Sequence, residues 1–132
     1  MQEKKSETLP QLLKNTYEDI PDRIALRFKD FGIWKTYTWS EYYRHVRDFA
    51  LGLASLGFGK GDKIGIIGEN QPPWYWGELA AQALGGICVG IFVDAVPKEL
   101  RYIVEHSDAS VVMAPDQEQV DKILEIRDGL PL

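Results

Sequence analysis

The chain is poor in the residues that build disulfides, metal centres and redox sites. Its 132 residues include one cysteine and two histidines. A single cysteine, Cys88, cannot close an intrachain disulfide, and no Cys/His spacing resembles a zinc site. Cys88 lies in an apolar stretch, which favours a packed core side chain over a reactive thiol. A disulfide-stapled secreted fold is therefore excluded, and a reducing compartment is expected.

Long apolar runs are also missing. The longest run covers residues 83–93, whereas a membrane-spanning helix needs roughly 20 apolar residues. The polar residues 1–7 lack the apolar centre of a signal peptide. We therefore expect a cytoplasmic protein without a transmembrane segment, and the sequence leaves peripheral contact with a membrane open.

An excess of basic residues is absent as well. Acidic residues number 20 against 15 basic ones, so the net charge is -5. Because nucleic-acid-binding surfaces are basic, no nucleic-acid partner is expected. The four tryptophans are not interleaved with basic residues and indicate packing instead. Trp74 and Trp76 stand two positions apart on a predicted helix, so we expect that they cannot both face one core and that one meets another part of a larger protein.

Neither phosphate-binding loops nor catalytic clusters can be found. No G-x-x-x-x-G-K-[ST] motif occurs, and the glycines of segment 57–61 precede a strand, whereas a dinucleotide loop follows one. His45 and His106 fall on separate predicted helices without the partners of a catalytic triad. The residues themselves predict no catalytic and no metal-ligating side chain in this chain.

The first half of the sequence predicts a helix, a β-hairpin and a second helix. Apolar residues recur at helical spacing over residues 9–20, with Thr8 as the expected N-cap. Alternating runs at 24–29 and 34–39 flank turn residues and indicate a hairpin. The next helix is expected to be capped by Ser40 and to end at Gly57, where a left-handed residue is favoured.

The second half alternates between buried strands and amphipathic helices. Residues 64–67 are apolar on both faces, which is typical of a strand within a parallel sheet. Right-handed crossovers between such strands give a doubly wound arrangement. The predicted fold class is therefore α/β, a hairpin plus helix followed by a parallel βαβαβα half-sheet. The expected elements are strands at 64–67, 87–93 and 110–113 and helices at 72–84, 97–106 and 116–127, the last with an apolar face of Val120, Ile123 and Leu124.

This change of pattern predicts two sections. Residues 1–59 would form part of one subdomain and residues 60–132 the start of a parallel α/β subdomain, joined by a flexible connection at 57–62. Another strand is expected after the last helix, so we interpret the chain as a truncated part of a larger fold. Glu69 and Asn70 follow the first parallel strand, at the edge where ligands of open α/β sheets lie. The alternative is that Asn70 caps the helix that begins at Pro72.

Five sequence blocks together resemble the AMP-forming acyl-CoA synthetases of the adenylate-forming superfamily, and the long-chain fatty acyl-CoA synthetases in particular. The resemblance covers roughly residues 9–131, and each block alone is weak. Two departures are Pro73, where the family usually has Glu, and segment 92–96, where the long-chain branch usually has a loop with Tyr and Thr. The blocks are W-x-x-x-T-W-S-E at 34–41, L-G-L-A-S-L-G at 51–57, the G-D-K and E-N-Q-P-P-W parts of 61–74, L-G-G-I at 84–87 and L-R-Y-I-V-E-H-S at 100–107.

The resemblance implies a two-step reaction of a full-length enzyme. ATP, with Mg²⁺, would activate a fatty acid as an acyl-adenylate, and coenzyme A would then displace AMP to form the thioester. The family places its Gly/Ser/Thr-rich loop ending in Lys, its Y-G-x-T-E block, its ribose-binding Asp and its C-terminal Lys outside the matched region. The isolated chain is therefore expected to be inactive and to bind no cofactor alone. Relatives with shorter substrates pass coenzyme A near the loop that corresponds to Val93, Asp94 and Ala95.

Other functions stay open at this point. Another adenylate-forming ligase, such as an aryl-CoA ligase or a peptide-synthetase adenylation domain, would share most of this scaffold. A free-standing α/β binding module is a second alternative, and an interaction arm at residues 9–20 is a third. The partners implied by the resemblance are a fatty acid and the rest of the same polypeptide, and a homodimer is left open.

Overall fold

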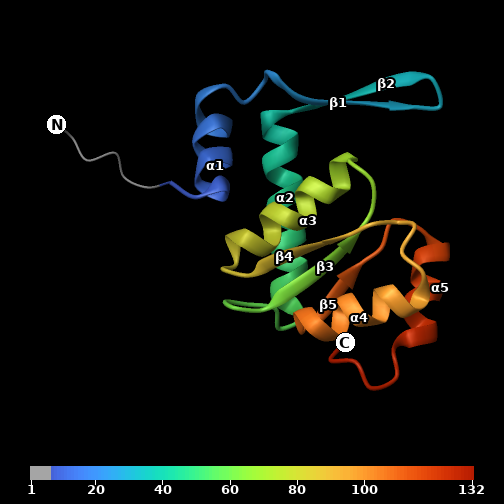
Figure 1. The fold of residues 1–132 in the computed structure, drawn as a ribbon. Helices are drawn as coiled ribbons and strands as arrows, with labels where there is room; N and C mark the ends of the chain where they lie inside the picture. Colours follow the sequence, from blue (N-terminus) through green and yellow to red (C-terminus); the bar gives the residue numbers. More distant parts are fainter. Residues whose placement is uncertain (1–6) are drawn as a thin grey trace.

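The structure, a computed structural model, describes residues 7–132 (Figure 1). Most of the polar segment at the N-terminus lies outside the described residues. Two separate sheets, an antiparallel hairpin and a parallel three-stranded sheet, confirm the predicted α/β class. The elements are α1 (Leu9–Asp19), β1 (Ile24–Asp30), β2 (Ile33–Thr38), α2 (Trp39–Ser55), β3 (Lys63–Ile67), α3 (Pro72–Ala83), β4 (Ile87–Ile91), α4 (Pro97–Ser107), β5 (Val111–Met113) and α5 (Gln117–Ile126).

The caps of the first two helices show how short polar motifs fix the ends of elements. Thr8 caps α1 as predicted, in a capping box with Gln11. The prediction that Ser40 caps α2 is wrong, because Thr38 is the N-cap. Its hydroxyl accepts from the Glu41 N–H at 3.2 Å, while the Glu41 carboxylate accepts from the Thr38 N–H at 2.8 Å. The reciprocal T-x-x-E pair therefore starts the helix two residues earlier than expected.

Strands β1 and β2 form the predicted hairpin and project from the body of the molecule (Figure 1). Asp30 pairs with Ile33, so the turn consists of Phe31 and Gly32 alone. Both turn residues have positive φ, 47° and 81°. This is the two-residue turn whose twist suits a hairpin.

The parallel sheet has the order β4-β3-β5, with β3 in the centre. Ile64 of β3 pairs with Cys88 of β4 on one side and with Val111 of β5 on the other. All of segment 64–67 is buried, as predicted for a strand within a parallel sheet. Strand β4 is shorter than predicted and ends at Ile91. It is an edge strand whose first residue, Ile87, is exposed, so the prediction of a buried second strand is corrected.

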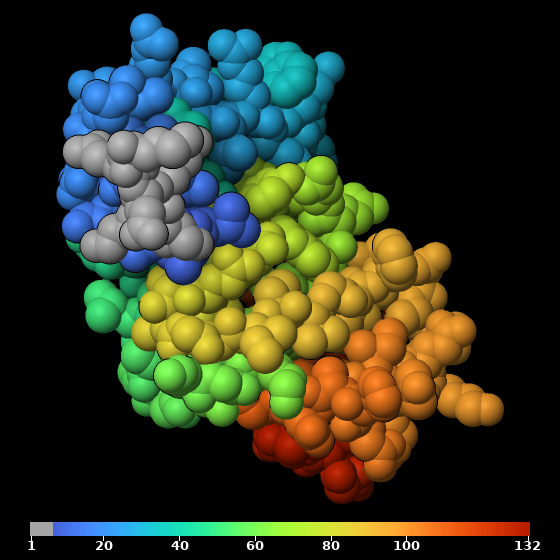
Figure 2. Space-filling view, turned by 60° about the vertical axis from the view of Figure 1, so that its left-hand side comes forward, coloured from blue at the N-terminus to red at the C-terminus, as the bar shows by residue number. Residues whose placement is uncertain are grey.

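Helices cover both faces of this sheet, which confirms the doubly wound arrangement. On one face Ile64 and Ile66 pack with α2 and α3. On the other, Ile67 and Ile91 pack with α4 and α5. Because successive β3 side chains alternate between the faces, one short strand supplies both cores. The hairpin and α1 gather at one end of the molecule and α4 and α5 at the other (Figure 2).

The first core crosses the predicted division at residues 59/60. It joins Leu13 of α1 and Val46 of α2 to Leu79 of α3. The connection at 57–62, predicted to be flexible, is a packed turn. Phe58 is buried, and the Gly59 N–H donates to the Asp62 carboxylate at 2.8 Å. Gly57 takes the predicted left-handed conformation at the end of α2, with φ of 87°.

Two further predictions about side-chain directions need correction. In α5 the buried face contains Gln119, Ile123 and Ile126, whereas Leu124 is exposed. The helix is thus rotated from its predicted orientation, because Gln119 finds a partner in the interior. The prediction that Trp74 and Trp76 cannot both face one core is wrong, because both pack against the first core.

Candidate functional site

The candidate site lies at the carboxyl-terminal edge of the parallel sheet. The loops that follow the three strands, at 68–71, 92–96 and 114–116, meet at this edge. The loop after β3 leads to α3 on one face, and the loop after β5 leads to α5 on the other. This divergence between neighbouring strands is a topological switch point, where open α/β sheets bind ligands.

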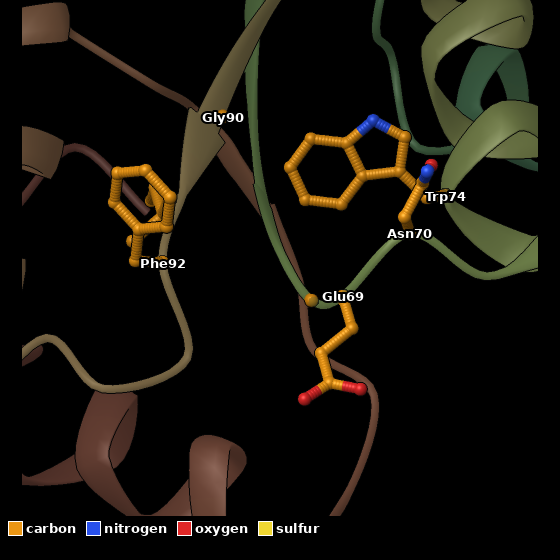
Figure 3. Close-up of a pocket in the computed structure, with 7 residues that line it drawn as sticks. Glu69, Asn70, Trp74, Gly90 and Phe92 are labelled. Carbon is orange, nitrogen blue, oxygen red and sulfur yellow. The ribbon is translucent and has the colours of Figure 1, made fainter.

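A first cavity of about 380 Å³ opens at this edge between Trp74 and Phe92 (Figure 3). We call it the Trp74–Phe92 cleft. A Cβ atom on Gly90 would lie 3.3 Å from the Trp74 ring, and one on Gly68 would lie 3.4 Å from it. The two glycines therefore leave room for the indole against the strand ends. The Phe92 side chain is almost fully exposed, so the cleft is apolar and open to solvent.

Asn70 at the rim of this cleft does not cap α3. Its side-chain oxygen accepts a hydrogen bond from the Tyr75 hydroxyl. Gln71 is the N-cap residue and makes no side-chain capping bond. Because Pro72 has no N–H, the first turn has fewer donors to satisfy. The alternative in which Asn70 caps α3 is therefore wrong, whereas its predicted position after the carboxyl end of β3 is confirmed.

A second cavity of about 550 Å³ lies at the switch point itself. We call it the switch-point cleft. The Val93 carbonyl at its wall accepts from Gln119 Nε2 at 3.1 Å and from Lys122 Nζ at 3.3 Å. Gln119 is 5% exposed and is the one buried polar side chain among residues 7–132. These two bonds fasten the loop after β4 to α5.

The three residues that were predicted to lie near coenzyme A do not share one environment. Val93 and Asp94 both line the switch-point cleft. Ala95 is buried in the second core and borders a groove of about 650 Å³ on the outer side of the loop. Phe92, Lys98 and Tyr102 line that outer groove. The contact of these residues with coenzyme A stays a prediction.

The charges of the switch-point cleft do not suit a polyphosphate. Four carboxylates line it, and its one lysine, Lys122, lies 3.4 Å from Glu118. An anion held there would meet net repulsion. No three His, Cys, Asp or Glu side chains within the described part of the chain gather to hold a metal ion. The residues present thus do not fit ATP with Mg²⁺. The four carboxylates are Glu69, Asp94, Asp116 and Glu118.

The two histidines stack on aromatic rings, and the cysteine is half-buried. His45 stacks on Trp76 with ring centroids 4.0 Å apart, and His106 stacks on Tyr102 at 5.4 Å. Neither arrangement is a triad. Burial, and secondarily the charge of Glu78, raises the pKa of the Cys88 thiol to about 11. Cys88 therefore stays protonated at neutral pH, as the prediction of an inert core thiol requires.

The sequence did not lead us to predict that Gln119 and Lys122 bind the loop after β4. A signal was available, because Gln119 stands four residues before Ile123 and seven before Ile126, within one helical stripe. A polar residue in an apolar stripe indicates a buried partner. The Trp74–Phe92 cleft carried no such signal, because its shape depends on which strands are neighbours.

Comparison with known proteins decides the family. A family model described as AMP-binding enzyme matches residues 13–131. The chain belongs to the AMP-binding enzyme family. The structure of VinN in complex with L-aspartate superposes with a TM-score of 0.85 at 24% identity, covering 95% of this chain and 34% of VinN. At that identity the superposition shows a shared fold and no more.

Two curated relatives of this chain are long-chain-fatty-acid–CoA ligases. The human ligase ACSBG1 is 32% identical over 124 residues, and ACSBG2 of Xenopus laevis is 30% identical over 124 residues. Each alignment covers 94% of this chain and 17% of the relative. The chain thus spans about a sixth of the length of the curated relatives it matches. Within residues 7–132, no helix has both the length and the apolar character needed to cross a membrane.

Proposed function

We propose that this chain is the N-terminal scaffold of an ATP-dependent, AMP-forming fatty acid–CoA ligase. The observation that carries the proposal is the family match over residues 13–131, together with ligases of long-chain fatty acids among its relatives. The whole enzyme would join a fatty acid to AMP and then transfer the acyl group to coenzyme A. Other adenylate-forming ligases share this fold, and the named relatives favour the fatty acid branch.

Electrostatics indicates which steps this chain and the other parts of the proposed enzyme would each serve. Attack of a carboxylate on the α-phosphate brings two anions together, which requires Mg²⁺ and converging cations or amides. The Trp74–Phe92 cleft and the switch-point cleft offer carboxylates, aromatic rings and one lysine, Lys122, which is paired with Glu118. We therefore assign to this chain the positioning of strand ends and loops, and to other parts of the enzyme the groups that contact the triphosphate.

We propose in addition that the loop containing Val93, Asp94 and Ala95 lies beside coenzyme A. The outer groove next to it supports this, since Lys98 could meet a phosphate and the exposed rings of Phe92 and Tyr102 could pack on apolar parts of the cofactor. Two carboxylates, Asp94 and Glu99, line this groove with Lys98, whereas four line the switch-point cleft with Lys122, so an anion would meet less repulsion in the groove. The Val93 carbonyl, fixed by Gln119 and Lys122, holds the loop in place.

Three finer assignments belong to the same proposal. The division into sections 1–59 and 60–132 rests on the change from an antiparallel hairpin to a parallel sheet, and the core shared by α1, α2 and α3 packs the two sections together. A cytoplasmic location is supported by the single, half-buried thiol. Self-association through α1 is supported by the exposure of Leu9 and Leu12.

The experiment that tests the proposed function is a comparison of two preparations. The native protein that carries this chain should convert palmitate, ATP and coenzyme A to palmitoyl-CoA, AMP and pyrophosphate. The isolated 132-residue chain should form none of these products. Release of ADP by the native protein, or acyl-CoA synthesis by the isolated chain, would contradict the proposal.

A further inference from the structure

The tip of the β1–β2 hairpin exposes apolar side chains that the fold does not use. Phe31 is 99% exposed, Ile33 69% and Trp34 63%. Phe31 also has a φ of 47°, a conformation that a bulky residue adopts at a cost and that Gly, Asn or Asp adopts readily. Neither the turn geometry nor packing within the described chain accounts for a phenylalanine there. A contiguous apolar tip of this kind indicates contact with something outside the described residues.

The charges behind the tip are basic, in contrast to the rest of the chain. The hairpin carries Arg27, Lys29 and Lys35 against one acid, Asp30, whereas the chain as a whole has a net charge of -5. Asp30 is neutralised by Lys35, whose Nζ lies 2.5 Å from its carboxylate. The remaining excess of positive charge on the hairpin therefore comes from Arg27 and Lys29.

The strand register brings these cations and the tryptophan onto one face. Lys29 lies directly opposite Trp34, and Arg27 lies opposite Thr36, two residues along on the same side. Lys29 Nζ lies 5.8 Å from the Trp34 ring centroid. The hairpin therefore presents apolar side chains at its tip, then the Trp34 indole beside Lys29, and then Arg27 nearer the base. Figure 1 shows that it extends away from the helices that could otherwise cover it.

We propose that this hairpin tip docks on an anionic lipid bilayer. Phe31 and Ile33 would enter the outer part of the hydrocarbon layer, and Trp34 would sit at headgroup level, where tryptophan is favoured. Arg27 and Lys29 would meet lipid phosphates while their aliphatic stems follow the indole toward the surface. The order of apolar, interfacial and cationic groups matches the order of layers in a membrane surface. The inference does not depend on the proposed ligase activity.

The test is flotation of the native protein, purified without detergent, with phosphatidylcholine vesicles that contain or lack phosphatidylserine. The double variant Phe31→Ser/Trp34→Ser should bind the anionic vesicles about tenfold more weakly or worse, because two large apolar side chains leave the bilayer. Leu56→Ser is the matched control, since Leu56 is a 74% exposed apolar residue at the end of α2, away from the hairpin. It should bind as the wild type does.

Two further readouts identify the source of the binding. Lys29→Gln should weaken binding to anionic vesicles more than to neutral ones, and added salt should remove this difference. Amide hydrogen exchange over residues 28–36 should slow when vesicles are present. Equal binding of the double variant and the wild type would overturn the proposal. So would protection of residues 28–36 that is complete before vesicles are added, because another part of the protein would then cover the tip.

Discussion

At the scale of single residues, Cys88 shows how position decides reactivity. It sits beside Ile64 in the parallel sheet, where burial raises the pKa of its thiol from 9.0 to about 11. The reactive thiolate should therefore be about a hundredfold rarer in the folded chain near pH 8 than for an ordinary thiol. Alkylation by iodoacetamide should be correspondingly slow and should accelerate on unfolding in urea. A folded-state rate equal to the unfolded-state rate would contradict this environment.

Asp94 tests the proposed coenzyme A contact. Asp94 is exposed on the loop between the switch-point cleft and the outer groove. Its charge would therefore repel the phosphates of a nearby coenzyme A. In the native protein, Asp94→Asn should lower the KM for coenzyme A by about two- to fivefold and leave the KM for ATP unchanged. Asp121→Asn, an exposed change on α5, is the control and should alter neither. An unchanged KM for coenzyme A in Asp94→Asn would place the cofactor elsewhere.

At the scale of elements, the start of α2 depends on one reciprocal pair. Thr38→Ala removes the hydroxyl that accepts from the Glu41 N–H, and should lower the free energy of unfolding by about 1 kcal/mol. Ser40→Ala should have little effect, because Ser40 lies inside the helix and is not its cap. Urea denaturation of both variants distinguishes the two positions. A larger loss for Ser40→Ala would contradict the observed cap.

The same pair predicts a pH dependence. The hydrogen bond from the Thr38 N–H, reinforced by the Thr38 hydroxyl, lowers the pKa of Glu41 below its ordinary 4.5. A lowered folded-state pKa means that the ionised carboxylate stabilises the fold above pH 4.5, and that this contribution disappears as the pH falls through the lower value. The stability difference between the wild type and Glu41→Gln should therefore narrow on acidification. A difference that is constant from neutral pH to below the folded-state pKa would contradict this assignment.

Alanine substitutions at two glycines should change the stability in opposite directions. A Cβ on Gly86 would lie 2.4 Å from Cε1 of buried Phe58 and 3.0 Å from the Asp62 carbonyl. Gly86→Ala should thus destabilise the chain by about 1–3 kcal/mol. Gly52 lies within α2 with nothing within 4 Å of an added Cβ. Gly52→Ala should stabilise by about 0.5–1 kcal/mol. If the urea midpoints of both variants rose, or both fell, relative to the wild type, the result would contradict this packing.

The helices and strands could be predicted from local patterns, but which face of each one is buried could be predicted only in part. The alternation at 24–29 and the doubly apolar run at 64–67 identified β1 and β3 because strand burial follows the sequence directly. The orientation of α5 was missed, since the hydrophobic pattern alone favours Leu124 on the buried side. The hydrophobic pattern carries no information about the hydrogen bond from Gln119 to the Val93 carbonyl, which is 26 residues away in the sequence.

At the scale of the whole molecule, the sheet order determines the site. The sequence predicted that Glu69 and Asn70 follow a strand at the ligand edge, because position after a buried strand is a local property. It could not predict that β3 lies between β4 and β5, which brings the loops at 68–71, 92–96 and 114–116 together. Both clefts arise from that order. The residues that line them therefore become recognisable only in the folded chain.

The core that joins α1 and α2 to α3 bears on the proposed role of this chain as a scaffold. Leu13, Val46 and Leu79 lie in one cluster, so the hairpin section and the parallel sheet are packed as one body. A scaffold of this kind would hold the loops at the sheet edge in fixed positions. The central claim is that this scaffold serves chemistry carried by other parts of an AMP-forming ligase.

The measurement that tests this claim most directly is the nucleotide sequence of the transcript beyond the codon for Leu132. The account predicts an open frame that encodes a Gly/Ser/Thr-rich loop ending in Lys, followed by a Y-G-x-T-E block. Those segments would supply the phosphate-binding groups that residues 7–132 do not bring together. A stop codon directly after Leu132 would contradict the account and would favour a free-standing binding module.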